Sequence, residues 1–344
     1  MAEAFLQLSS EDRNEALGVA AAASGRPTHL LEKDVWVVWA LRAMFESEFG
    51  AHLVFKGGTS LSKAYRAIRR FSEDVDLTYD IRAIAPDLVG ADVAEALPST
   101  KSQEKKWTKQ IRDRLEQWVA ESALLLIRSR LQREQLDATA SVDAESPEVL
   151  RIEYEHSASG SGYVQPVVLL EFGARSTGEP CDPMPVTCDA AEYLPTLTFP
   201  ASAPRVMKAE RTFWEKATAV HVFCVGGKLP GSRFSRHWYD LAQLDQAGHV
   251  DGALRRKDVA TQVAQHKKMF FSVKAGNGET VDYAIAIAGG LRLLPTGPRL
   301  ASLDEDYRQM IDDGLLLDGA KSFEEIIEAC RRLEARVNAA MTSK

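Results

Sequence analysis

The sequence has few cysteines and no long apolar run, and both absences narrow the class of protein. Only four cysteines occur in 344 residues. None forms a C-x-x-C pair or stands beside histidine at the spacing of a zinc site, so we expect buried thiols. No stretch approaches the roughly 18 uncharged apolar residues that cross a bilayer, and the start of the chain lacks a signal-peptide pattern. These absences predict a cytoplasmic protein that makes no use of a membrane.

Several catalytic signatures are missing as well. The sequence contains no G-x-x-x-x-G-K-[ST] phosphate loop, no G-x-G-x-x-G dinucleotide turn and no H-E-x-x-H zinc helix. The serine- and glycine-rich segment 157–162 is typical of a flexible loop and not of a G-x-S-x-G nucleophile elbow. P-loop, Rossmann and common hydrolase mechanisms are therefore disfavoured.

The charge is acidic overall but unevenly distributed. The composition, 45% hydrophobic and 26% charged, is that of a globular chain, and the formal net charge is −7. Residues 101–133 nevertheless hold nine Lys or Arg against four Asp or Glu, and residues 255–274 hold six against one. These stretches either bind a polyanion such as RNA or form solvated helix faces. Four aromatic residues among them either stack on bases or belong to the core. They are Trp107, Trp118, Phe270 and Phe271.

The order of the predicted elements indicates a mixed α/β (α+β) fold. Helices are predicted at 1–25, 30–47, 60–68, 101–135, 205–223 and 235–246, and strands at 52–55, 75–79, 151–156, 163–172 and 186–188. Residues 138–149 read as a polar linker, and a proline-rich segment, 180–204, marks a boundary. We therefore expect an α/β lobe with N-terminal packing helices over residues 1–200 and a helical lobe over residues 201–344.

Two aspartates on the second strand are the first candidates for catalysis. A strand's period of two places Asp74 and Asp76 on one face, while Val75 and Leu77 point into the core. Two hard oxygen ligands this close suit Mg²⁺, which keeps several waters and completes its shell with substrate phosphates. The alternative for an isolated D-x-D pair is a solvated strand face.

A glycine turn upstream favours the metal-binding interpretation. Gly57 and Gly58 end one strand and begin a helix, where backbone N–H groups can approach and bind phosphate. Thr59, Ser60 and Lys63 follow and add side-chain donors. A phosphate-binding turn followed by a D-x-D strand indicates transfer chemistry on a nucleoside triphosphate (NTP).

Two residues of later helices are weaker candidates by themselves. Lys216 faces either a cleft or solvent, where it would pair with the nearby Glu215 or Glu210. Asp240 follows Arg236 by four positions, the spacing of an ordinary helical ion pair. Their spacing alone does not assign them to a site.

Five segments resemble motifs of the AbiEii/MenT nucleotidyltransferase toxins, a branch of the polymerase-β-like superfamily. The segments are Glu32–Trp36, Phe55–Lys63, Arg70–Leu77, Arg211–Lys216 and Arg236–Leu241. The resemblance covers residues 30–245 and implies a polymerase-β-like lobe with a mixed sheet. It also implies a mainly helical C-terminal lobe that contributes Lys216 and Asp240 across a cleft.

The resemblance also implies roles for individual residues. The catalytic set is Asp74, Asp76, Lys216 and Asp240. The NTP-binding set is Gly57, Gly58, Thr59, Ser60, Lys63, Ser72 and Lys216. The metal ligands are Asp74, Asp76 and Glu171. Glu171 ends a buried strand and has a second interpretation, as an acid paired with Arg175.

The implied reaction is Mg²⁺-dependent transfer of NMP from an NTP to an RNA hydroxyl, with release of pyrophosphate. The acceptor end of tRNA is the expected target, and Asp76, Asp240 or Glu171 accepts the hydroxyl proton. The resemblance further implies the toxin of a bacterial toxin–antitoxin or abortive-infection system, with a cognate antitoxin protein as partner. The alternatives are transfer to a protein or small-molecule hydroxyl, and an NTP-binding regulator without turnover.

Overall fold

The chain divides into two compact units, each of which draws on separate parts of the sequence. The computed structural model describes residues 3–72, 74–89, 96–156, 165–226, 233–276, 278–316 and 321–342, so the predicted loop at 157–162 lies outside the described residues. The first unit comprises Met1–Ala64, Phe71–Ala96 and Trp107–Met207. The second comprises Tyr65–Arg70, Leu97–Lys106 and Lys208–Lys344.

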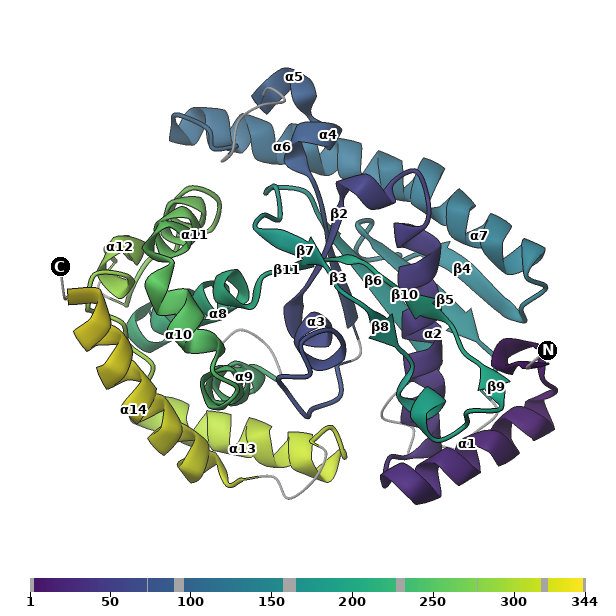
Figure 1. Ribbon diagram of the computed structural model, residues 1–344. Coiled ribbons are helices and arrows are strands. Elements are labelled where there is room, and N and C mark those ends of the chain that lie inside the picture. Colours follow the sequence, from purple (N-terminus) through teal and green to yellow (C-terminus); the bar gives the residue numbers. More distant parts are fainter. Residues whose placement is uncertain are drawn as a thin grey trace. The chain divides into compact units, whose positions relative to one another are not determined.

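A seven-stranded mixed sheet, in the order β4-β5-β6-β3-β2-β11-β7, forms the centre of the first unit (Figure 1). Its strands are β2 (Leu53–Lys56), β3 (Asp74–Tyr79), β4 (Ala138–Val142), β5 (Val149–Tyr154), β6 (Val167–Gly173), β7 (Cys181–Pro183) and β11 (Arg205–Met207). Strand β3 runs antiparallel to β2 and parallel to β6, and β11 runs parallel to β2. This arrangement confirms the mixed α/β fold class.

Two short ladders stand apart from the main sheet. Strand β1 (Glu3–Ala4) pairs in parallel with β9 (Leu197–Thr198), and β8 (Val186–Thr187) pairs antiparallel with β10 (Ala201–Ser202). The proline-rich segment 180–204 is thus built into the first unit, which ends just after it at Met207.

Two helices near the N-terminus, α1 and α2, pack on each other. Helix α1 (Ser10–Ser24) begins where the Ser9 side chain accepts a hydrogen bond from Asp12 and ends at Gly25, whose φ of 73° closes the helix. Helix α2 (Thr28–Phe45) is apolar on nearly all sides and almost wholly buried. Its Trp36 stacks on Tyr154 of β5, with ring centroids 5.1 Å apart. These contacts anchor α2 to the sheet of the first unit.

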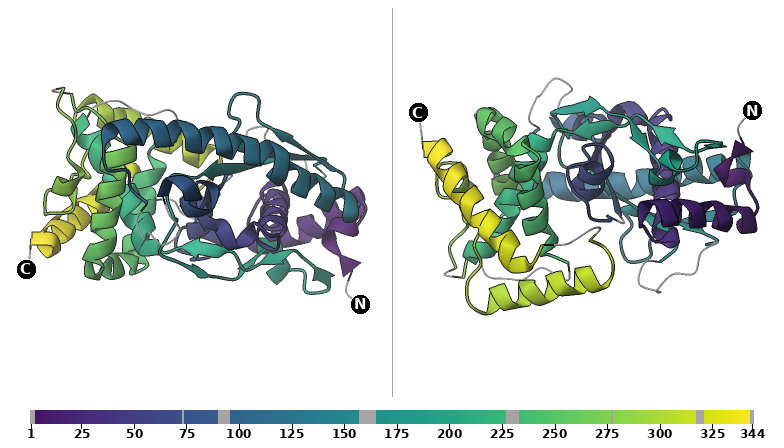
Figure 2. Two further views of the ribbon diagram at one scale, coloured as in Figure 1. Left: turned by 90° about the horizontal axis from the view of Figure 1, so that it is seen from above. Right: turned by 60° about the horizontal axis from the view of Figure 1, so that its bottom comes forward.

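A long helical segment carries the first basic stretch (Figure 2). It consists of α6 (Lys101–Trp118), one π-helical turn, η3 (Val119–Ala123), and α7 (Leu124–Arg133). Trp107 is buried, and Trp118 packs against the rings of Phe49, Tyr79 and Phe172. The two tryptophans are therefore core residues and not base-stacking residues.

Several local predictions are wrong. The helix predicted at 1–25 begins only at Ser10, after the short strand β1, and the helix predicted at 60–68 is α3, which spans Gly57–Lys63. Residues 138–149 are not a linker, because Ala138–Val142 forms the edge strand β4, whose central Ala140 carbonyl accepts a hydrogen bond from Arg128 of α7. The alternation of small and polar residues there is a strand pattern that charge and proline masked. The helix predicted at 205–223 begins only at Ala209, because Arg205–Met207 extends alongside β2 as β11.

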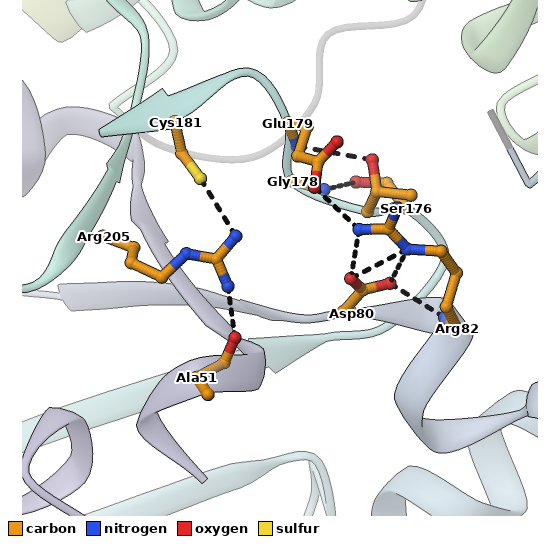
Figure 3. A network of polar contacts seen from close by, with 9 residues as sticks. Ala51, Asp80, Arg82, Ser176, Gly178, Glu179, Cys181 and Arg205 are labelled. Atoms are coloured by element: carbon orange, nitrogen blue, oxygen red, sulfur yellow. Dashed lines mark hydrogen bonds and ion pairs between the residues drawn. The ribbon is translucent and has the colours of Figure 1, made fainter. Parts of the chain in front are cut away.

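A polar network fixes the sheet at the end of β3 away from Asp74 (Figure 3). Asp80 follows β3 directly, and Arg82 of α4 (Ile81–Ile84) donates to both of its carboxylate oxygens and to Glu179. Arg205 donates to the Ala51 carbonyl and to the Cys181 sulfur. These contacts join the ends of strands that are far apart in sequence.

The second unit is mainly helical (Figure 2). Its helices are α8 (Ala209–Gly226), α9 (Arg236–Gln246), α10 (His249–Arg255), α11 (Lys257–Phe270), α12 (Tyr283–Ala286), α13 (Pro298–Asp312) and α14 (Phe323–Thr342). Two buried tryptophans anchor the core, because Trp214 donates to the Ala253 carbonyl and Trp238 to the Leu293 carbonyl. Among the described helices, none combines the length and the apolarity that a membrane crossing requires.

The cysteines and the short helices complete the description. All four cysteines are free thiols; Cys188 and Cys330 are buried, whereas Cys181 and Cys224 are partly exposed. The short helices are η1 (Phe5–Gln7), η2 (Gly50–His52), α3 (Gly57–Lys63), α5 (Pro86–Val89) and η4 (Asp189–Glu192). Of these, α3 and η4 carry residues of the candidate site.

Candidate functional site

The carboxylates of the first unit share one face of the sheet. In the β3–β6 pairing, Asp76 stands opposite Glu171 and Asp74 opposite Leu169. Because side chains alternate along a strand, Asp74, Asp76 and Glu171 project from the same face. Val75 and Leu77, on the other face, are fully buried. The strand therefore presents its two aspartates as the sequence period predicts.

The donor chemistry of this face fits a magnesium ion. Within the described ranges, no three Asp, Glu, His or Cys side chains converge as a metal cluster. Magnesium does not require such a cluster, because one or two carboxylates with waters and substrate phosphates complete its octahedral shell. Asp74 and Asp76 offer only hard oxygen donors, and Glu171 adds a third on the neighbouring strand.

Gly57 is fitted to the carboxylate of Asp76. The glycine has a φ of 76°, a conformation that favours glycine, and it stands at the junction of β2 and α3. A Cβ atom at this position would lie 1.9 Å from Asp76 Oδ2 and 2.7 Å from its Cγ. No other residue therefore leaves room for the observed position of the Asp76 side chain.

The hydroxyl groups of the turn serve the backbone of the site. Thr59 and Ser60 are buried, and the Thr59 hydroxyl donates to the carbonyls of Asp74 and Ser72. The Ser60 hydroxyl donates to the Gly57 carbonyl at 2.9 Å. Thr59 thus ties the turn to the start of the carboxylate strand. The predicted NTP contacts of Gly57, Gly58, Thr59, Ser60 and Ser72 remain predictions.

Lys63 lies in a buried ion cluster, a partnership that the sequence did not reveal. Its ammonium is 2.6 Å from a carboxylate oxygen of Asp34 in α2 and 2.6 Å from one of Asp189 in η4. The backbone N–H of Asp189 donates to Asp34, and Arg26 pairs with the Asp189 carboxylate. The Lys63 side chain is only 7% exposed. Its predicted role in NTP binding therefore competes with two ion pairs.

Burial and the neighbouring charges shift the pKa values of this cluster. Burial and the negative charge of Asp189 raise the pKa of Asp34 to about 6, against the opposing effect of Lys63. Burial alone would lower the pKa of Lys63, but the two carboxylates outweigh it and raise that pKa. Lys63 therefore stays charged, and Asp34 takes up a proton at a higher pH than an ordinary aspartate does.

The predicted residues of the second unit form a separate buried cluster. The Asp240 carboxylate is 0% exposed and lies 2.9 Å from Lys216 Nζ through Oδ2. It also accepts two hydrogen bonds from Arg70, at 2.7 Å from Nε and 2.9 Å from Nη2. Lys216 thus pairs with Asp240 and not with its sequence neighbour Glu215, and Asp240 pairs with Lys216 and Arg70 and not with Arg236. One carboxylate thus orients two cations, and the net charge of the three groups is +1.

Arg70 was not singled out by the sequence, although it lies in one of the segments that resemble family motifs. Its partner is 170 residues away, so no local pattern could have identified it. The burial of Asp240 would raise its pKa, but Arg70 and Lys216 outweigh burial and hold that pKa well below the usual range. A carboxylate with two cationic partners is a poor proton acceptor. Asp240 therefore positions Lys216 and is disfavoured as the general base.

The charges of this cluster also act on the neighbouring residue His237. Burial, Lys216 and Arg236 lower the pKa of His237 well below its ordinary value, so the imidazole is neutral. Its Nδ1 atom is buried and has no hydrogen-bond partner among the described residues. Lys216 therefore has a cation, Arg70, and the carboxylate of Asp240 near it, whereas His237 adds no charge.

The predicted site residues thus fall into two groups. The first unit holds the carboxylates with the glycine turn, and the second unit holds the Lys216–Asp240 pair with Arg70. In the first group the three carboxylates share one face of the sheet, whereas Lys63 lies in its ion cluster with Asp34 and Asp189.

Comparisons with known proteins identify the family. The family model described as "Nucleotidyl transferase AbiEii toxin, Type IV TA system" matches residues 39–329. No curated protein sequence matches the chain. Among solved structures, MenT4, a nucleotidyltransferase toxin from Mycobacterium tuberculosis H37Rv, is similar, with 16% identity and a TM-score of 0.43 over 95% of this chain and 99% of that chain. Because the family match covers most of the sequence, this chain belongs to the AbiEii family of nucleotidyltransferase toxins of type IV toxin–antitoxin systems.

Proposed function

We propose that this nucleotidyltransferase uses Mg²⁺ to transfer NMP from an NTP to a hydroxyl group of RNA, at the acceptor end of tRNA. The oxygen of the acceptor hydroxyl forms a bond to the α-phosphorus. The bond from that phosphorus to the bridging oxygen breaks, and pyrophosphate leaves with the electron pair. The modified RNA would account for the toxin activity of the family.

The fit of Asp76 against Gly57 carries this proposal. The glycine turn and the carboxylate strand are separate features of the sequence, yet the space above Gly57 is filled by the Asp76 carboxylate. The Thr59 hydroxyl adds a second link, to the backbone of Asp74. A turn that presents backbone N–H groups and a strand that presents carboxylates are thus held as one unit, as binding of a metal–triphosphate requires.

Each residue group has a task in the proposed reaction. Asp74 and Asp76 would hold the magnesium ion, which supplies charge stabilisation at the phosphates. Lys216, kept in place by Asp240, neutralises the triphosphate. Such catalysis consists mainly of positioning and charge stabilisation, a task that suits a lysine held in place by a buried carboxylate.

The proton of the acceptor hydroxyl goes to a carboxylate of the sheet. Asp240 has two cationic partners and a lowered pKa, so it is a poor acceptor. Asp76 and Glu171 stand opposite each other on adjacent strands and are the remaining candidates. We assign the proton to this pair, because either carboxylate can accept it when it lies within hydrogen-bond reach of the hydroxyl.

The direct test is transfer of label. Purified protein is incubated with Mg²⁺, each α-³²P-labelled NTP in turn and total bacterial RNA, and the products are resolved on a denaturing gel. We expect label in a tRNA-sized band with at least one NTP. Asp74→Ala should abolish the label, whereas Asp137→Ala, at an exposed position outside the site, should retain it.

The outcomes separate the parts of the proposal. Label in protein or in a small product would replace RNA as the acceptor, and NTP binding without label anywhere would indicate a regulator without turnover. In cells, expression should arrest growth, and co-expression of the cognate antitoxin, the proposed protein partner, should relieve the arrest. Growth unaffected by the wild-type chain in several hosts would contradict a toxin role for this chain.

A further inference from the structure

The two basic stretches of the sequence meet within the second unit. Lys101, the first residue of α6, donates from Nζ to the carbonyls of Lys268 and Met269, at 3.0 and 2.7 Å. These carbonyls belong to the last turn of α11, where a cation compensates the negative end of the helix dipole. The start of α6 and the end of α11, 167 residues apart in sequence, are therefore fixed side by side.

Lysines dominate the surface around this junction. The segments 101–106 and 266–283 hold six lysines against three acids. The lysines are Lys101, Lys105, Lys106, Lys267, Lys268 and Lys274. Five of them are exposed, all but Lys267. In the part of the chain that the structure describes, neither Lys105 nor Lys106 forms an ion pair, so their charges are available to a polyanion.

One aromatic ring is exposed among these lysines. Phe271, directly after α11, is 38% exposed, and the Lys267 ammonium lies 4.6 Å from its ring centroid. The backbone of Phe271 is fixed on both sides, because its N–H donates to the Lys267 carbonyl and its carbonyl accepts from the Tyr283 hydroxyl at 2.6 Å. The ring is thus held in one position at the surface, in contact with the Lys267 ammonium and the His266 ring.

We propose that this lysine–Phe271 surface binds a single-stranded segment of RNA, with one base stacked on Phe271 and the phosphates held by the lysines. Binding of single strands typically combines a positively charged track with aromatic side chains on which bases stack. Lys267 adds a cation–π contact to the same ring. The surface belongs to the second unit and is distinct from the carboxylate strand.

Charge and geometry favour single-stranded RNA over other occupants. A paired base is stacked within its helix and cannot lie on Phe271, so a duplex would gain only the lysine contacts. An acidic protein would gain the same lysine contacts without the planar stacking partner. The inference rests on the proposed RNA acceptor for its biological meaning, but binding is measurable without catalysis.

The test measures binding in the absence of the reaction. Fluorescence anisotropy with a labelled oligouridylate, and with an RNA duplex of equal length, is performed on the full chain in EDTA without NTP. We expect tighter binding of the single strand. Phe271→Leu should weaken it by about 5- to 150-fold, the equivalent of one base stack at about 1–3 kcal/mol. Phe271→Trp should preserve the affinity, which also shows that the site tolerates substitution.

The lysines are tested by salt dependence. Lys105→Glu with Lys106→Glu should weaken binding and should reduce the slope of log Kd against log salt by about 1.4, or about 0.7 for each lost phosphate contact. The matched control is Arg331→Glu with Arg332→Glu on α14, which changes the net charge equally at exposed positions. This control should lose much less affinity.

Three results would overturn the proposal. They are equal affinity for duplex and single strand, a Phe271→Leu variant within twofold of wild type, and equal losses in the lysine and arginine pairs. The proposed reaction can fail separately. If the protein binds RNA through Phe271 but transfers no label to RNA, the binding surface stands and RNA is not the acceptor of the reaction.

Discussion

Gly57→Ala gives the sharpest test of the link between the glycine turn and the carboxylate strand. The added Cβ would lie 1.9 Å from Asp76 Oδ2, closer than non-bonded atoms approach, so the carboxylate must move by about 1 Å. A displacement of this size in a catalytic group typically costs about 100-fold in rate. Alanine in the left-handed region adds about 1–2 kcal/mol of strain.

The strain and the displacement are separable with a matched control. Gly25 has a φ of 73°, close to the 76° of Gly57, but a Cβ atom added at Gly25 would meet nothing within 4 Å. Gly25→Ala should therefore cost a similar free energy of unfolding and leave label transfer unchanged. Gly57→Ala should lose both transfer and the stabilisation that Mg²⁺ with a non-hydrolysable NTP gives the wild type, about 2.7 kcal/mol at a concentration 100 times Kd.

Two outcomes would refute this reasoning. If Gly57→Ala transfers label as well as Gly25→Ala, the position of the Asp76 carboxylate against the turn has no catalytic importance. If Gly57→Ala loses transfer but keeps the full stabilisation by Mg²⁺ and NTP, the glycine acts after binding and Asp76 is not the metal ligand that it positions.

Three further predictions concern buried ionisable groups. Asp240→Asn should lower the free energy of unfolding by about 3–5 kcal/mol, because it removes the carboxylate that the buried Arg70 and Lys216 share. Asp245→Asn, in a partly exposed pair, should cost less than about 1 kcal/mol in the same urea titration. Burial lowers the pKa of His221 to about 4, so between pH 6.5 and 4 the unfolded chain binds more protons than the folded one and stability falls as the pH falls. His221→Asn should reduce this loss, which urea midpoints at pH 7.5 and 5 measure. Lys63→Met should destabilise the chain by about 3–5 kcal/mol, and adding Asp34→Asn should recover part of the loss; unchanged stability with lost NTP binding would instead support the NTP role of Lys63.

Local patterns were sufficient for the elements around the carboxylates. The apolar strand, the glycine break and the alternating strand are each encoded within a few residues, and β2, α3 and β3 form close to the expected positions. The linker predicted at 138–149 was wrong because its polar composition hid the alternation of side chains in β4. An edge strand tolerates polar residues. The start of α8 was misplaced because Arg205–Met207 takes its strand conformation from pairing with β2 and β7.

The partners of the charged residues were beyond reach of local patterns. Proximity in sequence suggested Glu215 for Lys216, and the i, i+4 spacing suggested Arg236 for Asp240. The fold instead brings Lys216 and Asp240 to each other. Tertiary contacts between buried charges outweigh i, i+4 pairs, which contribute only a few tenths of a kcal/mol in water. Arg70 shows the same limit, because its partner is known only when the chain has folded.

The interleaving of the two units has a consequence for a cell that makes this toxin. The second unit takes Tyr65–Arg70 and Leu97–Lys106 from within the span of the first, and the sheet of the first is not complete until β11 at Arg205–Met207. No contiguous fragment contains either unit alone. A nascent chain on the ribosome therefore acquires the Arg70–Asp240 contact only after Asp240 has been made, 170 residues after Arg70. Truncated translation products and proteolytic pieces that end before Asp240 should be harmless.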